Sequence, residues 1–295
     1  MNLDIIQKFY LVVEDFKQLT KMRLALSVVF SSLAGYFLAA KTIEVIPVIL
    51  LFTGGFFIVG ASNVFNQVLE KDLDLLMKRT KNRPLPGKRI SLNTALIIAV
   101  LMTLIGLFLL YKINFRTSFF GALAILIYTC IYTPLKTKTP LSVFVGAIPG
   151  AIPFMLGWVA CTNKFGVEPG VLFMIQFFWQ FPHFWAIGWM LDDDYKKAGF
   201  KMLPTGDKDK STAFLIVMYT VWMIIVSIAP LSPYTGVLNL TLIGAAIVLF
   251  LGIIMLYFAL DLMKKTSTLA AKKLMYASVG YISVLQIVYV LDKYI

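Results

Sequence analysis

The chain has 295 residues, of which 59% are hydrophobic and only 14% are charged, and its mean hydropathy is +0.83. This composition excludes both an ordinary soluble domain and a disordered chain. The apolar runs are about as long as the roughly 20 residues that a membrane-spanning helix needs, and the sequence lacks the alternating pattern of a membrane β-barrel. We therefore expect an all-α, polytopic membrane protein.

The first twenty residues contain charged side chains and no uninterrupted apolar core, unlike a cleavable signal peptide. Their apolar residues follow helical spacing, which predicts an amphipathic helix at the membrane interface. The acidic residues argue against a mitochondrial presequence and favour a bacterial plasma membrane. We expect an N-terminal cytoplasmic interfacial segment over residues 1–23 and a single transmembrane domain over residues 24–291.

Nine spans follow from apolar length and from the turn residues between the runs. They cover residues 24–40, 46–70, 93–111, 117–135, 141–161, 168–191, 212–231, 236–261 and 274–291. With the N-terminus in the cytoplasm, 22 of the 27 Lys and Arg residues lie on the cytoplasmic side, which is the positive-inside pattern. This topology explains the net charge of +12 without nucleic-acid binding. The last three spans carry few internal polar groups and are expected to be structural.

The segment over residues 62–89 leaves the second span and ends in a group of basic residues. Asn66, Glu70 and Asp74 are spaced four residues apart, so on a helix they share one face, from which Asp72 points away. These oxygen ligands suit Mg²⁺, which takes one or two protein carboxylates and adds water and substrate phosphate. The basic residues that would hold the phosphate are Lys78, Arg79, Lys81, Arg83, Lys88 and Arg89. The pattern predicts a magnesium–diphosphate site, although a basic loop alone is more often a topology signal.

The segment over residues 128–158 joins the fourth and fifth spans and is rich in Tyr, Pro and Gly. Lys136 and Lys138 fall in its loop, on the same predicted side as the acidic residues. Tyr128 and Tyr132 share a helix face, and they belong either to the core or to the lining of a cavity that tolerates a cation.

The sixth span ends in a second acidic group, formed by Asp192, Asp193 and Asp194. An even number of spans separates the two groups, so both lie on the cytoplasmic side and can bind two metal ions bridged by one diphosphate. A solvated helix end is the plainer alternative for these three residues.

His183 is the only histidine, and Pro182 beside it should kink the span and open a cavity. A lone His in an apolar helix is more often a packing residue than a ligand.

These segments together resemble the UbiA superfamily of intramembrane prenyltransferases, most closely its heme O synthase branch, over roughly residues 18–290. The matching segments are LTKMRLALSVVFSSLAGYFLA, NQVLEKDLDLLMKRTKNRPLP, YTPLKTKTP, GAIPGAIPFMLGW, FPHFW and DDYKKAGFKMLP. Glu70 stands where the family usually has Asp, and Lys196 replaces the second Asp of the superfamily's Asp-x-x-x-Asp motif. Asp194 and Tyr195 match the Asp-Tyr of this branch.

The resemblance implies nine transmembrane helices bundled around a central cavity, with a cytoplasmic cap and a cytoplasmic active site. It implies transfer of the farnesyl group of farnesyl diphosphate to a vinyl group of heme b, with addition of water, and Mg²⁺ as cofactor. Membrane lipid and a heme A synthase or an oxidase-assembly protein are the other expected partners. On this basis the metal ligands are Asn66, Glu70, Asp74, Asp193 and Asp194, and all of these except Asp193 are also assigned as catalytic. The diphosphate is assigned to Arg79, Arg83, Lys136, Lys138 and Arg23, of which Arg23 lies at the cavity mouth. The heme is assigned to His183.

Two other functions stay open. A prenyltransferase can instead act on an aromatic quinone precursor or a chlorin, although the FPHFW segment weighs against this acceptor class. A transporter of divalent cations or lipid diphosphates should carry polar groups near the membrane midplane, whereas the acidic residues here gather at one face. Release of diphosphate from farnesyl diphosphate, on addition of an acceptor, separates an enzyme from a transporter.

Overall fold

The computed structural model describes residues 3–295, and every regular element in that range is a helix. Eight of the helices are long and apolar enough to cross a membrane, which makes the chain a multi-pass membrane protein. They are α2 (Met22–Ala39), α3 (Val45–Leu69), α5 (Leu92–Ile113), the run of α6 (Phe115–Leu126), η1 (Ile127–Tyr132) and α7 (Thr133–Leu135), α8 (Ser142–Thr162), α11 (Lys210–Ser227) with η2 (Ala229–Leu231), α12 (Leu242–Lys265) and α13 (Thr268–Asp292).

The helix α9 (Val167–Met190) is as long as these eight helices but less hydrophobic, since Gln, Pro and His interrupt its apolar sequence. With α9, each of the nine predicted spans is a helix. Seven predicted starts agree within two residues, whereas α12 begins six residues later and α13 six residues earlier than expected. Both differences follow from N-terminal capping. The Thr241 hydroxyl accepts a hydrogen bond from Gly244 N and starts α12 there. Ser267 caps α13, which therefore begins before its two lysines and continues through them.

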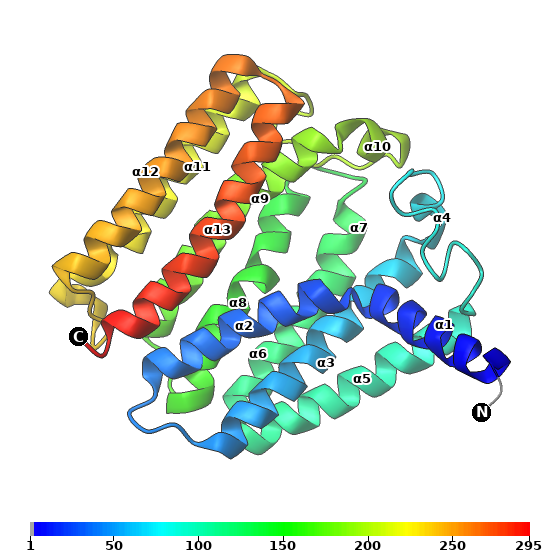
Figure 1. Cartoon of the computed structure of the whole chain (residues 1–295), viewed down its shortest axis with the longest axis horizontal. Coiled ribbons are helices and arrows are strands. Elements are labelled where there is room, and N and C mark those ends of the chain that lie inside the picture. The colour runs from blue at the N-terminus through cyan, green and yellow to red at the C-terminus, as the bar shows by residue number, and fades with distance from the viewer. Residues whose placement is uncertain (1–2) are drawn as a thin grey trace.

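The helices form one bundle that α13 closes by packing against both α9 and α2 (Figure 1). The short helices α4 (Lys71–Asp74) and α10 (Asp192–Lys197) lie at the same end of this bundle, as the even number of intervening spans predicts (Figure 1). The amphipathic helix α1 (Leu3–Thr20) lies at that end too, where the Gln67 amide donates to the Leu19 carbonyl at 2.7 Å. The N-terminal segment is therefore helical, as its apolar spacing predicts, and the helix is tied to α3.

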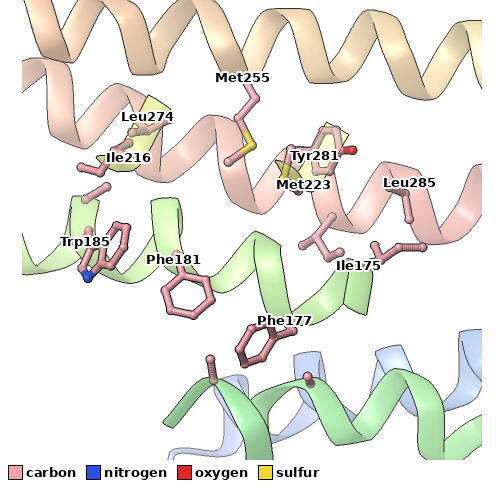
Figure 2. Close-up of a cluster of buried hydrophobic side chains, with 14 of the residues drawn as sticks. Ile175, Phe177, Phe181, Trp185, Ile216, Met223, Met255, Leu274, Tyr281 and Leu285 are labelled. Carbon is pink, nitrogen blue, oxygen red and sulfur yellow. The ribbon is translucent and has the colours of Figure 1, made fainter. Parts of the chain in front are cut away.

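The main apolar core lies among α9, α11, α12 and α13 (Figure 2). Phe181 and Trp185 of α9 point into it with Ile216 and Met223 of α11. The opposite face of α9 carries polar side chains that line a cavity, described below. The core thus holds α9 in place while leaving its polar face open.

The helices α2 and α8 cross at very close range through two glycines. A Cβ atom at Gly157 would overlap the Ser32 carbonyl oxygen, and one at Gly35 would overlap the Phe154 carbonyl oxygen. Small residues at such crossings let membrane helices approach backbone to backbone. This contact joins the two walls of the bundle that enclose the cavity.

Candidate active site

A cavity of about 790 Å³ lies between α2, α3, α8, α9 and α13. Its volume falls within the range of small-molecule and cofactor sites, about 300–1,000 Å³. Most of its wall is apolar, and its charged residues gather at the end next to α4. Those charged residues are Lys21, Glu70, Asp74, Arg79, Arg83 and Lys136.

The first acidic group lines this charged end. Asn66, Glu70 and Asp74 all face the cavity, whereas Asp72 is exposed and does not line it. Glu70 N donates to the Asn66 carbonyl at 3.0 Å and Asp74 N donates to the Glu70 carbonyl at 2.7 Å. These bonds carry the helical path from α3 into α4, so the three side chains share the face that their spacing predicts.

Both carboxylates are held in ion pairs with basic residues of other segments. Lys136 Nζ lies 2.8 Å from Glu70 Oε1, and Arg83 Nη1 lies 2.8 Å from Asp74 Oδ2. The Asp74 side chain is 1% exposed, and its Oδ1 atom has no hydrogen-bond partner among residues 3–295. A buried carboxylate oxygen without a partner is costly, so this atom fits a ligand for a cation.

Lys21, which precedes α2, is a site residue that the sequence reasoning did not single out. Its Nζ donates to Asn66 Oδ1 at 3.2 Å, and it lines the cavity. Burial, together with the positive charges of Arg83 and Lys136, lowers the pKa of Lys21 to about 7. The sequence signal for it is the TKMR segment, which contains both Lys21 and the predicted Arg23.

Lys136 is oriented by an irregular stretch of helix. The π-helical turn η1 ends two residues before Pro134, which has no N–H to donate to the preceding turn. Such π-helical turns often mark functional sites. The turn η1 directs Tyr128 and Tyr132 to the cavity, and Lys136 Nζ lies 4.7 Å from the Tyr132 ring centroid. Burial acts to lower the pKa of Lys136, but the Glu70 carboxylate together with Tyr128 and Tyr195 acts the other way, and the net effect raises the pKa.

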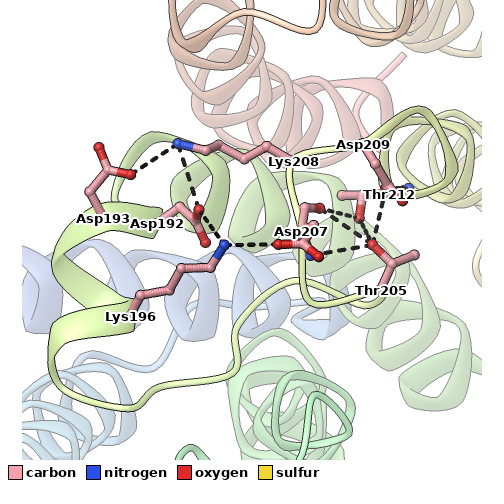
Figure 3. A network of polar contacts seen from close by, with 8 residues as sticks. All are labelled: Asp192, Asp193, Lys196, Thr205, Asp207, Lys208, Asp209 and Thr212. Carbon is pink, nitrogen blue, oxygen red and sulfur yellow. Dashed lines mark hydrogen bonds and ion pairs between the residues drawn. The ribbon is translucent and has the colours of Figure 1, made fainter.

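The second acidic group lies outside the cavity lining, and its three members differ in their surroundings. Asp192 is buried and paired with Lys196 at 3.1 Å and with Lys208 at 3.6 Å (Figure 3). The Asp193 side chain is 87% exposed and pairs with Lys208. Asp194 Oδ2 accepts from Arg79 N at 3.4 Å, which lowers the pKa of Asp194 although its partial desolvation acts the other way. Asp194 is thus the member of the group that reaches the basic loop.

The structure does not bring every predicted site residue together. In residues 3–295, no group of three or more His, Cys, Asp or Glu is arranged to hold a metal ion by itself. Arg79 and Arg83 line the cavity, whereas Arg23 and Lys138 are exposed and do not. Each of the latter two lies two residues from a lysine that does face the cavity. Lys21 has a left-handed backbone (φ 48°) just before α2, and Lys136 and Lys138 lie in the turn that follows α7, so the local turn geometry sets which side chain faces inward.

His183 lies deeper in the cavity wall and has a defined orientation. Its Nδ1 is 2.8 Å from Ser278 Oγ, and that hydroxyl donates to the Met275 carbonyl at 2.7 Å. Because the hydroxyl proton is already used, Nδ1 is the protonated nitrogen and donates, which leaves the Nε2 lone pair available. Trp179 stacks on the imidazole with ring centroids 4.7 Å apart.

The expectation that the last three spans are purely structural is wrong for α13. Gln286 of α13 lines the cavity together with Ser31 of α2 and with Gln176 and Gln180 of α9. All four are buried inside the bundle. The signal was present in the sequence, because polar residues within membrane helices are costly and rarely without a role.

Comparison with known proteins identifies the family to which the chain is related. The model of the UbiA prenyltransferase family matches residues 28–283. The chain is 62% identical to the protoheme IX farnesyltransferase of Christiangramia forsetii, over 96% of this chain and 95% of that protein. It is 60% identical to the protoheme IX farnesyltransferase of Flavobacterium psychrophilum, over 96% of both.

Solved structures share the fold at low identity. A structure of digeranylgeranylglyceryl phosphate synthase matches with a TM-score of 0.77 and 19% identity, covering 95% of this chain and 98% of that one. A UbiA homologue from Archaeoglobus fulgidus bound to DMAPP and Mg²⁺ matches with a TM-score of 0.69 and 13% identity, covering 92% and 99%.

Proposed function

The chain belongs to the UbiA prenyltransferase family, and we propose that it transfers the farnesyl group of farnesyl diphosphate to a vinyl group of protoheme IX. The observation that carries this proposal is a single cavity with two chemically distinct parts. One end presents four basic and two acidic side chains, and the rest is apolar and leads past His183. A diphosphate with a long apolar tail matches the first part, and a flat apolar acceptor beside an imidazole matches the second. The near full-length identity to named protoheme IX farnesyltransferases supports the same acceptor.

The basic residues bind and orient the diphosphate. Lys21, Arg83 and Lys136 approach the cavity end from three segments, and Arg79 borders it. Guanidinium groups contact phosphate oxygens in pairs and ammonium groups contact them as point charges. Their fixed positive charges lower the barrier for breaking the C1–O bond, because negative charge develops on the departing diphosphate.

The acidic residues fit a divalent metal. Asn66, Glu70 and Asp74 would hold it, with Asp194 on the facing segment, and the partnerless Asp74 Oδ1 is the observation that favours this assignment. The solved UbiA homologue with DMAPP and Mg²⁺ supports the choice of metal for the family. Bound Mg²⁺ neutralises part of the negative charge of the diphosphate. Because so few protein oxygens converge here, substrate and water would complete the coordination.

The apolar part of the cavity protects the allylic cation from bulk water. Tyr128 and Tyr132 line it, and aromatic faces attract cations. His183 would contact the heme through Nε2, with its ring fixed by Ser278 and Trp179. On this proposal the acceptor would lie deeper in the membrane than the diphosphate.

The cellular setting follows from the same proposal. The charged end of the cavity faces the cytoplasm of a bacterium, since the positive-inside rule assigns the segments around α4 and α10 to that side. A heme A synthase or an oxidase-assembly protein would take up the product. The 1–23 segment would remain at the membrane interface, and residues 24–291 would act as one catalytic domain.

The test uses the purified full-length protein in lipid vesicles, given farnesyl diphosphate, protoheme IX and Mg²⁺. Mass spectrometry should find heme O and stoichiometric diphosphate. The matched reaction replaces protoheme IX by 4-hydroxybenzoate and should yield no prenylated product. Prenylated 4-hydroxybenzoate without heme O would show that the acceptor is a quinone precursor.

A further inference from the structure

A cluster of buried polar side chains lies in the membrane-spanning wall of the cavity, apart from the acidic and basic residues. It consists of Ser31, Gln176, Gln180 and Gln286, which are between 1% and 7% exposed. Gln286 Nε2 donates to Ser31 Oγ at 3.0 Å and to Gln176 Oε1 at 3.1 Å. Gln180 Nε2 donates to the carbonyl oxygens of Ala147 at 2.8 Å and Gln176 at 3.2 Å. These bonds fix the orientation of all three amides.

Two atoms of this cluster remain without a partner in the part of the chain that the structure describes. They are Gln176 Nε2, a donor, and Gln180 Oε1, an acceptor, and both side chains line the cavity. The neighbouring helix α8 leaves room for the acceptor, because a Cβ atom at Gly150 would overlap Gln180 Oε1. A donor and an acceptor that both border one cavity offer two of the two to four polar partners that a bound water molecule takes.

The cluster lies on the face of α9 that carries His183. Gln180 and Gln176 precede His183 by three and seven residues, or about 4.5 and 10 Å along the helix axis. A water molecule held there would stand beside the proposed heme and away from the diphosphate end. The apolar walls around it limit access by other water molecules.

We propose that Gln176 and Gln180 hold the water molecule that becomes the hydroxyl group of the product, an inference that rests on the proposed farnesyl transfer. The terminal vinyl carbon forms a C–C bond with farnesyl C1 while the C1–O bond breaks and diphosphate leaves with the electron pair. The vinyl carbon next to the pyrrole becomes a cation. The water oxygen forms a C–O bond to that carbon and releases one proton, whose charge balances the extra negative charge that the diphosphate carries away. No oxidant or reductant is needed.

The two glutamines would therefore be positioning residues that decide between two products. If the water is not held near the cation, the adjacent CH₂ group loses a proton instead. The product is then an alkene that is lighter than heme O by one water. Bond formation to farnesyl is unaffected in this outcome, so the ratio of the two products reports on water placement alone.

The experiment compares two substitutions at one position in the full-length protein. Gln180→Met and Gln180→Glu both lose the amide donors, and only the glutamate keeps an oxygen acceptor. Thr220→Val is the matched control, since Thr220 is buried in α11, bonds to the Ile216 carbonyl at 2.8 Å and does not line the cavity. Each protein is given farnesyl diphosphate, protoheme IX and Mg²⁺ in ¹⁸O-labelled water, and the hemes are separated and weighed.

We expect Gln180→Met to raise the ratio of dehydrated to hydrated product roughly tenfold, since the loss of one hydrogen bond of about 1.4 kcal/mol changes a rate by that factor. Gln180→Glu and Thr220→Val should keep the wild-type ratio and the label. An unchanged ratio in Gln180→Met overturns the inference. If Gln180→Met no longer binds farnesyl diphosphate, the same product ratio is measured for Gln176→Met, which removes the donor and leaves Gln180 in place. An unchanged ratio in Gln176→Met then overturns the inference. Absence of any prenylated heme in the wild type would instead refute the proposed function.

Discussion

Asp72 and Asp74 differ in their surroundings although they lie two residues apart. Asp74 is buried against the cavity and Asp72 is exposed. We expect Asp74→Asn to lower heme O formation at least about a hundredfold, because the amide keeps the shape of the side chain but removes the charge that would hold the metal. Asp72→Asn should stay within a few-fold of the wild type. Rates from initial product formation decide, and equal losses in both variants would contradict the assignment.

Metal removal gives a separate prediction for the same group of residues. EDTA should stop turnover of the wild-type protein, and Mg²⁺ should restore it. The variant Asp74→Asn should remain slow at Mg²⁺ concentrations that fully restore the wild type. Turnover that continues after exhaustive chelation would remove the metal from the proposal.

His183 allows heme binding to be separated from diphosphate binding. We expect His183→Ala to lose the wild-type heme absorption spectrum and to bind heme at least about tenfold more weakly, because no other imidazole exists in the chain. Binding of farnesyl diphosphate should be unchanged, since the basic residues at the α4 end remain. Ser278→Ala should weaken heme binding less, as it frees the ring without removing Nε2. A normal heme spectrum in His183→Ala would make His183 a packing residue.

At the scale of single residues, spacing predicted one part of the site and missed another. The face formed by Asn66, Glu70 and Asp74 follows from helical geometry, so the sequence suffices to find it. Which of two nearby basic residues faces the cavity depends on the turn at a helix end, and this is why Lys21 and Lys136 line the cavity while Arg23 and Lys138 do not. The amide cluster joins α2, α9 and α13, and no local pattern reveals contacts between such distant segments.

At the scale of elements, the crossing of α2 and α8 predicts a sharp effect on stability. We expect Gly157→Ala to destabilise the protein by about 1–3 kcal/mol, because the new methyl group forces the two backbones apart. Gly170→Ala in α9 is the matched control, since no atom lies within 4 Å of a Cβ atom there. Thermal unfolding in detergent measures both. Equal midpoints for the two variants would show that the crossing can relax without cost.

Element ends were less predictable than element positions. Apolar length located all nine spans, but the starts of α12 and α13 depend on capping by Thr241 and Ser267 rather than on hydropathy. The π-helical turn η1 was not predicted, because Pro134 indicates a local irregularity but not its form.

At the scale of the whole molecule, the common location of α4 and α10 makes a topology test decisive (Figure 1). Lys81 and Lys208 lie in the loops at that end, and Lys164 lies in the loop between α8 and α9. After Cys130 and Cys161 are replaced by Ser, cysteines are introduced singly at these three positions. A membrane-impermeant thiol reagent added to intact cells should label only position 164, and permeabilised cells should show all three. Labelling of position 81 in intact cells would place the site on the outer side.

The ion pairs Glu70–Lys136 and Asp74–Arg83 have a thermodynamic consequence for ligand binding. Two of the basic groups offered to the diphosphate, Lys136 and Arg83, are thus already bonded to carboxylates offered to the metal. Breaking a buried pair for one ligand leaves an uncompensated charge, which is costly. When metal and diphosphate arrive together, the freed carboxylates and the freed cations each gain a new partner. The two ligands must therefore strengthen each other's binding by the same factor, since a coupling free energy acts equally in both directions.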